Sequence, residues 1–200
     1  MPVISQWATP WHGLEAVLNI WNVCLGIAVF FLARVLAILY FINNIDDESI
    51  RSQSRNRLLP ESIVFLLFFL AFLAHWLIAD GFAVNPDTQE IFMQPYKYAL
   101  NLLEMPYVTS ILLVGVILVL WGIGKTYLNP SYREGIWFSG TGTVLTVLAL
   151  LLCAGWNHTA YYPSITDLQS SLTLQNSCSS PFTLKVMSYV SILIPFVLAY

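Results

Sequence analysis

The residue of this sequence that most needs a chemical explanation is Arg34, which stands inside a long apolar run. If the run is a helix, Arg34 lies roughly 12 Å along the axis from its inner end, at about 1.5 Å per residue. A lone charge at such a depth in a bilayer is costly, so it needs a partner or a path to water. We expect no acid of this chain at that depth, because the acids at 46–48 stand at the inner surface and Asp80 and Glu104 near the outer one.

Two interpretations of Arg34 follow from this. In the first, its counter-ion belongs to protein outside this chain, and Arg34 makes a buried contact between subunits or between halves of a larger protein. In the second, the guanidinium snorkels to the inner surface and has no function. Glu104, just before an apolar run, is interpreted as a solvated acid at a helix start.

The three histidines are the residues that could bind a metal or haem. His12 precedes the first apolar run and His158 follows the fourth, so only His75 is embedded. A membrane haem needs an axial histidine and a facing histidine or methionine, and no embedded methionine stands at the depth of His75. The sequence therefore predicts no metal ligand, no cofactor-binding residue and no catalytic constellation within this chain.

Two further features have simple structural interpretations. The stretch SGTGTV at Ser139–Val144 is a fragment of a dinucleotide-binding fingerprint, but it opens an apolar run instead of following a strand. Its small residues are expected to permit close helix contact. Cys24 and Cys153 fall in apolar runs as packing residues, whereas Cys178, in a polar loop, is expected to be accessible.

The elements that must position these residues are membrane helices. Of 200 residues, 58% are hydrophobic and 10% charged, against about 25% charged in an ordinary soluble domain. The net charge of -3, with no basic patch, excludes nucleic acid as a partner. A span needs about 20 apolar residues as a helix, so we predict an all-α membrane bundle with five spans forming one transmembrane domain over 1–200. The expected helices are 18–43, 62–79, 107–127, 135–156 and 182–200.

The distribution of basic residues predicts the orientation, because cytoplasmic loops are enriched in arginine and lysine. The loop between runs one and two and the loop between runs three and four are basic, whereas 157–181 has no Lys or Arg. We expect the N-terminus and the loops 80–106 and 157–181 outside, and the C-terminus inside. The basic residues are Arg51, Arg55, Arg57, Lys125 and Arg133.

Three stretches resemble subunit II of cytochrome bd quinol oxidase. They are WHGLEAVLNIWNVCLGIAVFFLARVLAILYFINNIDDESIR, then IADGFAVNPDTQEIFMQPYKYALNLLEMP, and finally YYPSITDLQSSLTLQNSCSSPFTLKVMSYVSILIPFVLAY. The order of YPS, SLT, SS, TLKVM and a PxVLAY helix in the third is the most specific part. Family members are nearly twice as long, with two four-helix bundles and one extra helix, so the chain resembles their C-terminal half and is expected to be a fragment or truncation.

The resemblance implies a haem-free subunit, not catalytic alone, in a membrane quinol:O₂ oxidoreductase of aerobic respiration. Haem b and haem d would belong to subunit I, the partner, with quinol and O₂ as substrates of the complex and a proton gradient as its product. The implied location is the bacterial cytoplasmic (inner) membrane. The alternatives are a small polytopic transporter, for which an embedded arginine is a typical substrate contact, and a non-catalytic assembly or scaffold protein. Against the transporter, no internal repeat and no paired broken helices stand out.

Overall fold

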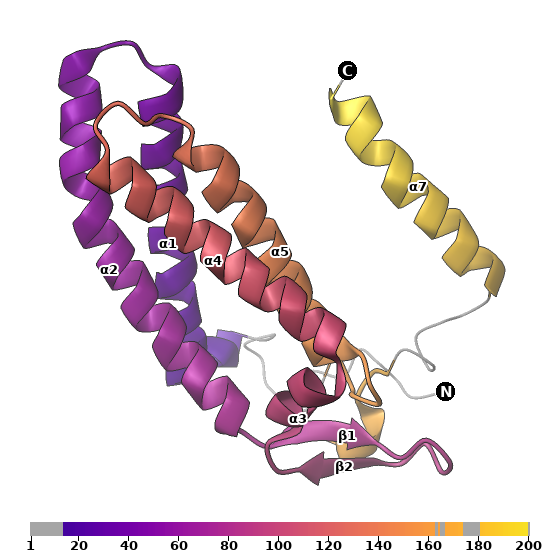
Figure 1. Cartoon of the computed structure of the whole chain (residues 1–200). Coiled ribbons are helices and arrows are strands. Elements are labelled where there is room, and N and C mark those ends of the chain that lie inside the picture. Colours follow the sequence, from indigo (N-terminus) through magenta and orange to yellow (C-terminus); the bar gives the residue numbers. More distant parts are fainter. Residues whose placement is uncertain (1–13, 163, 165–166, 174–180, 200) are drawn as a thin grey trace.

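A computed structural model describes residues 14–162, 164, 167–173 and 181–199 of the chain. Four long helices lie side by side (Figure 1): α1 (Ile20–Asn44), α2 (Glu48–Ile78), α4 (Pro106–Leu128) and α5 (Gly135–Gly155). The α1–α2 turn and the 129–134 loop meet at one end of this bundle, which we call the basic end. A small sheet and a short helix cover the other, which we call the sheet end.

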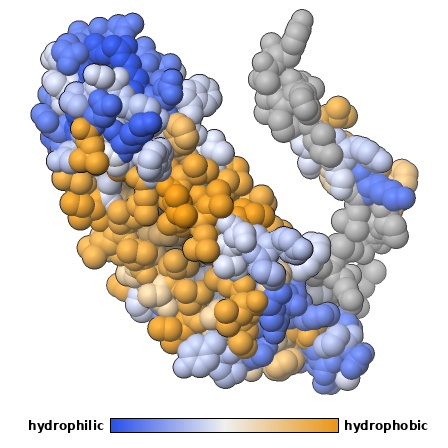
Figure 2. Space-filling model, viewed as in Figure 1, coloured by the Kyte–Doolittle hydropathy of each residue, from blue (hydrophilic) through white to orange (hydrophobic). Residues whose placement is uncertain are grey.

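The surface of the bundle shows what solvent it requires. Each of the four helices is long and apolar enough to cross a membrane, and apolar residues form a broad belt between two hydrophilic ends (Figure 2). Large side chains such as Phe30, Leu67 and Ile117 are more than half exposed along this belt. Such a surface belongs in lipid. The predicted all-α membrane fold is confirmed.

Three of the helices match the predicted ranges closely, since α1, α4 and α5 begin and end within two residues of them. The last predicted helix, 182–200, corresponds to α7 (Pro181–Ala199), which lies apart from the four-helix bundle (Figure 1). Every α7 side chain that the structure describes is exposed. Within the described residues, four helices qualify as candidate spans by length and composition, and α7 is not among them.

Helix α2 corrects the prediction that the second helix begins at Ser62. It begins at Glu48, where the Asp47 carboxylate accepts a hydrogen bond from the Ile50 N–H at 3.0 Å, a standard N-cap. The helix then continues through Pro60, which lies on its exposed side. A proline removes one backbone hydrogen bond, but Leu58 before it and Glu61 and Ser62 after it are buried against the bundle, and this packing on both sides of the proline keeps the helix continuous.

The segment expected as an outer loop, 80–106, also has regular structure. Strands β1 (Gly81–Val84) and β2 (Ile91–Gln94) pair antiparallel, and α3 (Lys97–Glu104) follows. The turn between the strands is an Asx turn, in which the Asn85 side chain accepts from the Asp87 N–H at 2.9 Å. Short 3₁₀ helices at Leu14–Leu18 and Leu168–Ser170 complete the described elements.

The core of the bundle is an apolar cluster to which α1, α2 and α4 contribute. It holds Ala28, Val35, Leu39, Leu58, Phe65, Val119 and Ile123. A second cluster under the sheet joins Val84, Ile91 and Ala160. Because the lipid-facing side chains are equally apolar, hydrophobicity alone does not decide which helix faces pack together.

Glycines decide how α4 and α5 pack. A Cβ added to Gly142 would lie 2.5 Å from the Gly115 carbonyl oxygen, and one added to Gly122 would lie 2.5 Å from the Gly135 carbonyl oxygen. The two backbones are therefore in contact at these two levels, with buried Ser139 donating to the Val119 carbonyl at 3.0 Å between them. The prediction of close helix contact through SGTGTV holds for Gly142, whereas Gly140 faces open space.

Gly142→Ala should destabilise the protein, and Gly140→Ala should not. The added methyl at 142 meets backbone atoms that cannot move aside unless the helices separate, which costs on the order of 1–3 kcal/mol. At 140 the same change removes a glycine from a helix without a steric cost. Thermal unfolding of both variants in one detergent measures the difference, and equal midpoints would contradict this account of α4–α5 packing.

Candidate functional site

The centre of the candidate site is an ion pair between α1 and α2 inside the apolar belt. The Arg34 Nε donates to Glu61 Oε2 at 2.7 Å, and the Nη2 donates to Glu61 Oε1, so the guanidinium and the carboxylate are paired through two parallel bonds. Glu61 is buried, with 7% of its side chain exposed, whereas the Arg34 side chain is 47% exposed. The pair thus neutralises Glu61 inside the bundle and leaves one side of Arg34 at the surface.

This arrangement corrects the expectation that no acid of the chain lies at the depth of Arg34. Helices α1 and α2 form an antiparallel hairpin, in which residues at similar distances from the turn face each other. Arg34 and Glu61 satisfy that condition once α2 begins at Glu48. The predicted start of the second helix at Ser62 places Glu61 just outside the expected span, and this is why the sequence-based expectation misses the pair.

The basic end is held together by the arginines that predicted the orientation. Arg55 of α2 donates from Nη1 to the carbonyls of Thr126 at 2.6 Å and Asn129 at 2.9 Å, and from Nη2 to that of Pro130 at 2.7 Å. The last carbonyls of a helix have no partner within it. A cation near them is also stabilised by the partial negative charge at the C-terminal end of the helix dipole. Arg55 therefore caps α4 from another helix.

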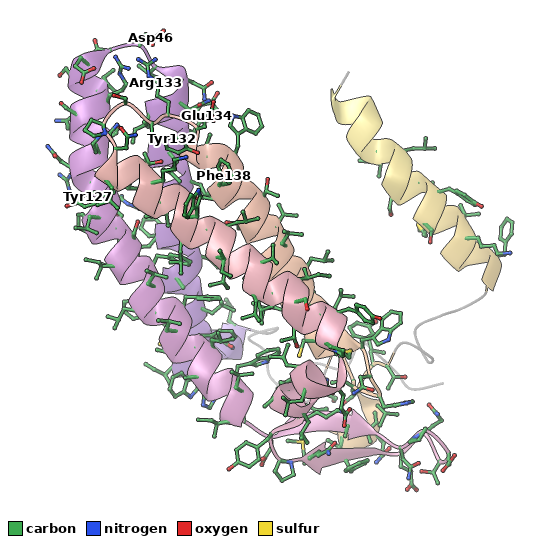
Figure 3. All side chains as sticks on the ribbon, in the orientation of Figure 1. Asp46, Tyr127, Tyr132, Arg133, Glu134 and Phe138 are labelled. Atoms are coloured by element: carbon green, nitrogen blue, oxygen red, sulfur yellow. The ribbon has the colours of Figure 1, made fainter. Side chains whose placement is uncertain are left out.

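Other contacts at this end tie the two interhelical turns to each other. Arg133 donates to the Asp46 carboxylate at 2.8 Å, and the Lys125 ammonium lies 4.4 Å from the centroid of the Tyr132 ring. Figure 3 shows Asp46, Arg133 and Tyr132 gathered around these turns. Burial raises the pKa of the Tyr132 phenol, and the charge of nearby Glu134 raises it further. These groups fix the end of the bundle through exposed and half-exposed pairs, each of modest strength.

The sheet end contains a buried polar network centred on Asn101 of α3. The Asn101 Nδ2 donates to the Cys153 carbonyl at 2.9 Å and to Thr159 Oγ1 at 2.8 Å, and its Oδ1 accepts from Asn157 at 3.2 Å. Asn157 also donates to Glu104, which is exposed at the end of α3. The network satisfies the Cys153 carbonyl in the last turn of α5 and attaches α3 to that end of the helix.

Lys97 is the buried cation of this network. Its Nζ donates to the Asn157 carbonyl at 3.0 Å, and its stem covers Gly81, where a Cβ would lie 2.6 Å from the Lys97 Cβ. Burial lowers the pKa of Lys97 below its ordinary value of 10.5, and the negative charge of Glu104 opposes part of that shift. Lys97 is thus held charged in an unfavourable environment that its hydrogen bond only partly offsets.

The described histidines and cysteines, namely His75, His158, Cys24 and Cys153, lie apart from the ion pair. The His75 ring stacks on Trp21 at 3.9 Å between centroids, with an interplanar angle of 6°. His158 follows α5 in a left-handed conformation, at φ 52°, and its carbonyl accepts from Val84 at 2.8 Å. Within the described part of the chain, no three side chains of His, Cys, Asp or Glu come together as metal ligands.

Two of the residues considered from the sequence, His12 and Cys178, lie outside the described residues. Of the other cysteines, Cys153 is buried in α5 and its Sγ donates to the Tyr98 carbonyl at 3.3 Å, while Cys24 is half-buried in α1. Both therefore occupy packing positions within the bundle, as the sequence predicts.

Comparison with known proteins places this fold in a family. The sequence model of the family described as cytochrome bd terminal oxidase subunit II matches residues 3–200. The chain belongs to this family. The resemblance found in the three sequence stretches is thereby confirmed.

Curated relatives carry the same family description. The chain is 30% identical over 120 residues to "Cytochrome bd-I ubiquinol oxidase subunit 2" of Escherichia coli K12, and equally to the proteins of that name from strains O6:H1 and O157:H7. Each match covers 59% of this chain and 30% of the relative. The chain therefore aligns with about a third of the length of these subunits.

Replacing Lys97 with methionine should change how stability depends on pH. Because the pKa of Lys97 is lowered in the folded state, burying its charge costs stability below that lowered pKa, and the cost is relieved as the pH rises toward 10.5. As the pH rises toward that ordinary lysine value, the unfolding midpoint of the unmodified chain should therefore rise relative to that of Lys97→Met.

Gln94→Met, which changes a neutral residue of the sheet end, is the control. Its unfolding midpoint should depend on pH as that of the unmodified chain does. Detergent-solubilised samples over this pH series provide the measurement. Parallel curves for the unmodified chain and Lys97→Met would show that Lys97 is not held charged at a cost.

Proposed function

We propose that this chain is a haem-free part of subunit II in a membrane quinol:O₂ oxidoreductase. The observation that carries the proposal is the family match over residues 3–200, together with four apolar helices suited to a membrane. In this assignment subunit I binds haem b and haem d and oxidises quinol, and the complex reduces O₂ to water in the bacterial inner membrane. The chain is not catalytic alone and contributes to the proton gradient only within the complex.

The surroundings of His75, the embedded histidine, support the assignment of the haems to a partner subunit. An axial haem ligand must direct a ring nitrogen at the iron, opposite a second ligand on another helix. His75 instead stacks face to face on Trp21, and the nearest described acids and histidines form no cluster with it. Among the described residues, the chain therefore offers a poor fit to a six-coordinate haem.

The space between the helices supports a structural role over transport of a polar substrate. A cavity of about 260 Å³ lies among α1, α2, α4 and α5 and is lined by apolar side chains and by Thr143 and Thr146. Both threonine hydroxyls donate to carbonyls of their own helix, of Ser139 and Gly142, at 2.8 Å. The cavity thus presents no free polar group to a substrate, unlike the binding sites of transporters.

Arg34 is the residue through which we expect the bundle to contact the rest of the enzyme. Its pairing with Glu61 satisfies the charge but leaves nearly half of the side chain exposed within the apolar belt. Burying such a surface against another protein segment is less costly than leaving it in lipid. The contact partner would be subunit I or the part of subunit II that the match to this chain does not include.

The basic end is proposed to face the cytoplasm, with the sheet end outside. The proposal rests on the arginines and lysine at the basic end. Cysteines introduced at two exposed loop positions test it in a Cys178→Ser background. A membrane-impermeant thiol reagent should label Asp87→Cys in the β1–β2 turn of intact cells or spheroplasts, and Ser131→Cys at the basic end only after lysis.

These two positions are matched, because each contributes only its backbone N–H to the turn in which it lies, with the Asn85 and Asn129 side chains as acceptors. Neither substitution removes a side-chain bond that is seen in the structure. The reverse labelling pattern would overturn the proposed orientation.

Expressed alone, the chain should insert into the membrane and show neither haem absorbance nor quinol oxidation. Coexpression of subunit I and the remainder of subunit II should yield a haem-containing complex. In that complex His75→Ala should leave the haem spectrum unchanged, because the axial ligands belong to subunit I. Stoichiometric haem in the lone chain, lost in His75→Ala, would refute the haem-free assignment.

A further inference from the structure

The Arg34 guanidinium has one edge that the chain itself leaves unused. Arginine carries five N–H donors in a fixed planar fork. The Nε and Nη2 groups donate to Glu61, and no acceptor among the described residues lies on Nη1. The Arg34 Cζ lies over the ring of Phe30, 5.7 Å from its centroid, and this hydrocarbon side chain has no oxygen or nitrogen to accept from Nη1. The Nη1 donors are therefore directed away from the pair.

The surface around Arg34 is shaped for the close approach of another helix. Ala33 and Ala37 lie beside Arg34 on the exposed side of α1, and the larger Phe30 and Phe41 lie one turn further along in each direction. Small residues let two membrane helices bring their backbones together, and interhelical hydrogen bonds then hold them. Arg34 thus lies among small side chains, between two phenylalanines on a membrane-facing surface, and we call this stretch of α1 the notch.

Charge determines what such a helix can present to the notch. Glu61 already neutralises Arg34 through two bonds, so a second carboxylate would add an unpaired negative charge at membrane depth. Hydrocarbon supplies no acceptor for the Nη1 donors. A neutral acceptor satisfies them without adding charge, for example a Ser, Thr, Asn or Gln side chain or a helix carbonyl exposed by a kink.

We propose that the notch at Ala33, Arg34 and Ala37 binds a transmembrane helix from outside this chain through a neutral hydrogen-bond acceptor on that helix. The inference rests on the proposed function, which supplies the partner. The length of the curated relatives, of which the matched stretch covers 30%, leaves room for such a helix within subunit II itself. The Arg34–Glu61 pair then acts as a neutral unit that donates outward.

Three variants in the complete complex distinguish the candidate partners: Glu61→Gln, the double variant Arg34→Leu/Glu61→Leu, and Glu90→Gln. The last removes an exposed carboxylate in the β1–β2 hairpin and is the control. The readouts are the amount of complex that copurifies with a tag on this chain, the amount of this chain in the membrane, and the haem content per complex.

With a neutral acceptor, Glu61→Gln leaves Arg34 charged and uncompensated, so copurified complex should fall by about tenfold or more. The double variant removes both charges and loses only the outward hydrogen bond. It should insert normally and weaken the complex by about three- to tenfold, the effect of one net hydrogen bond. Glu90→Gln should match the unmodified protein.

Two outcomes would overturn the proposal. If the partner presented an acid, Glu61→Gln would be tolerated and the double variant would be the more damaging, because the partner's carboxylate would lose its cation. If Arg34 faced lipid alone, the double variant would assemble like the unmodified protein. In either case normal haem content per complex would leave the subunit II assignment intact, whereas a chain that never copurifies with a haem-containing partner would refute the proposed function itself.

Discussion

A bilayer offers no partner for polar groups, and this constraint shapes every interaction that holds the described bundle together. The backbone is satisfied by helices, and the hydroxyls of Ser62, Thr126 and Thr146 donate back to carbonyls of their own helix. The one charged residue deep in α1, Arg34, is met by Glu61 from α2. At this depth no water is available to hydrogen-bond an unpaired polar group. Each polar side chain in the belt therefore needs a partner within the protein, and the helices must align to provide it.

The two halves of the bundle meet that requirement by different means. Helices α1 and α2 are joined by an ion pair whose geometry fixes their relative depth, since a shift by one turn would separate Arg34 from Glu61. Helices α4 and α5 are joined by backbone contact at Gly122 and Gly142, where no side chain larger than hydrogen fits. Arg55 connects the two pairs by reaching from α2 to the end of α4. The result is a bundle whose register is set by a few polar and small residues, while its apolar residues serve both packing and lipid contact.

The sheet end is built around polar side chains that replace backbone partners. Gln169 pairs with both the N–H and the carbonyl of Ile91, at 3.1 and 2.9 Å, as a neighbouring strand would. Asn101 closes the end of α5, and Lys97 fills the space above Gly81. This end is therefore a compact cap of its own, well suited to hold the helices at fixed spacing outside the hydrocarbon. These hydrogen bonds between its elements fit a structural role for the chain within the proposed oxidase.

Composition and hydropathy were sufficient to predict an all-α membrane protein and three helix ranges, because length and apolarity alone determine whether a helix can span lipid. The three family-like stretches were likewise sufficient for the family. Three other features depend on which residues meet in space: the start of α2 at Glu48, the hairpin at 81–94 and the pairing of Arg34 with Glu61. In the sequence a proline indicates a helix boundary. In the structure Glu61 and Ser62 are buried against the bundle, and α2 continues through Pro60. Only the tertiary structure, by setting α2 antiparallel to α1, decided that Glu61, the acid beside Pro60, is the partner of Arg34.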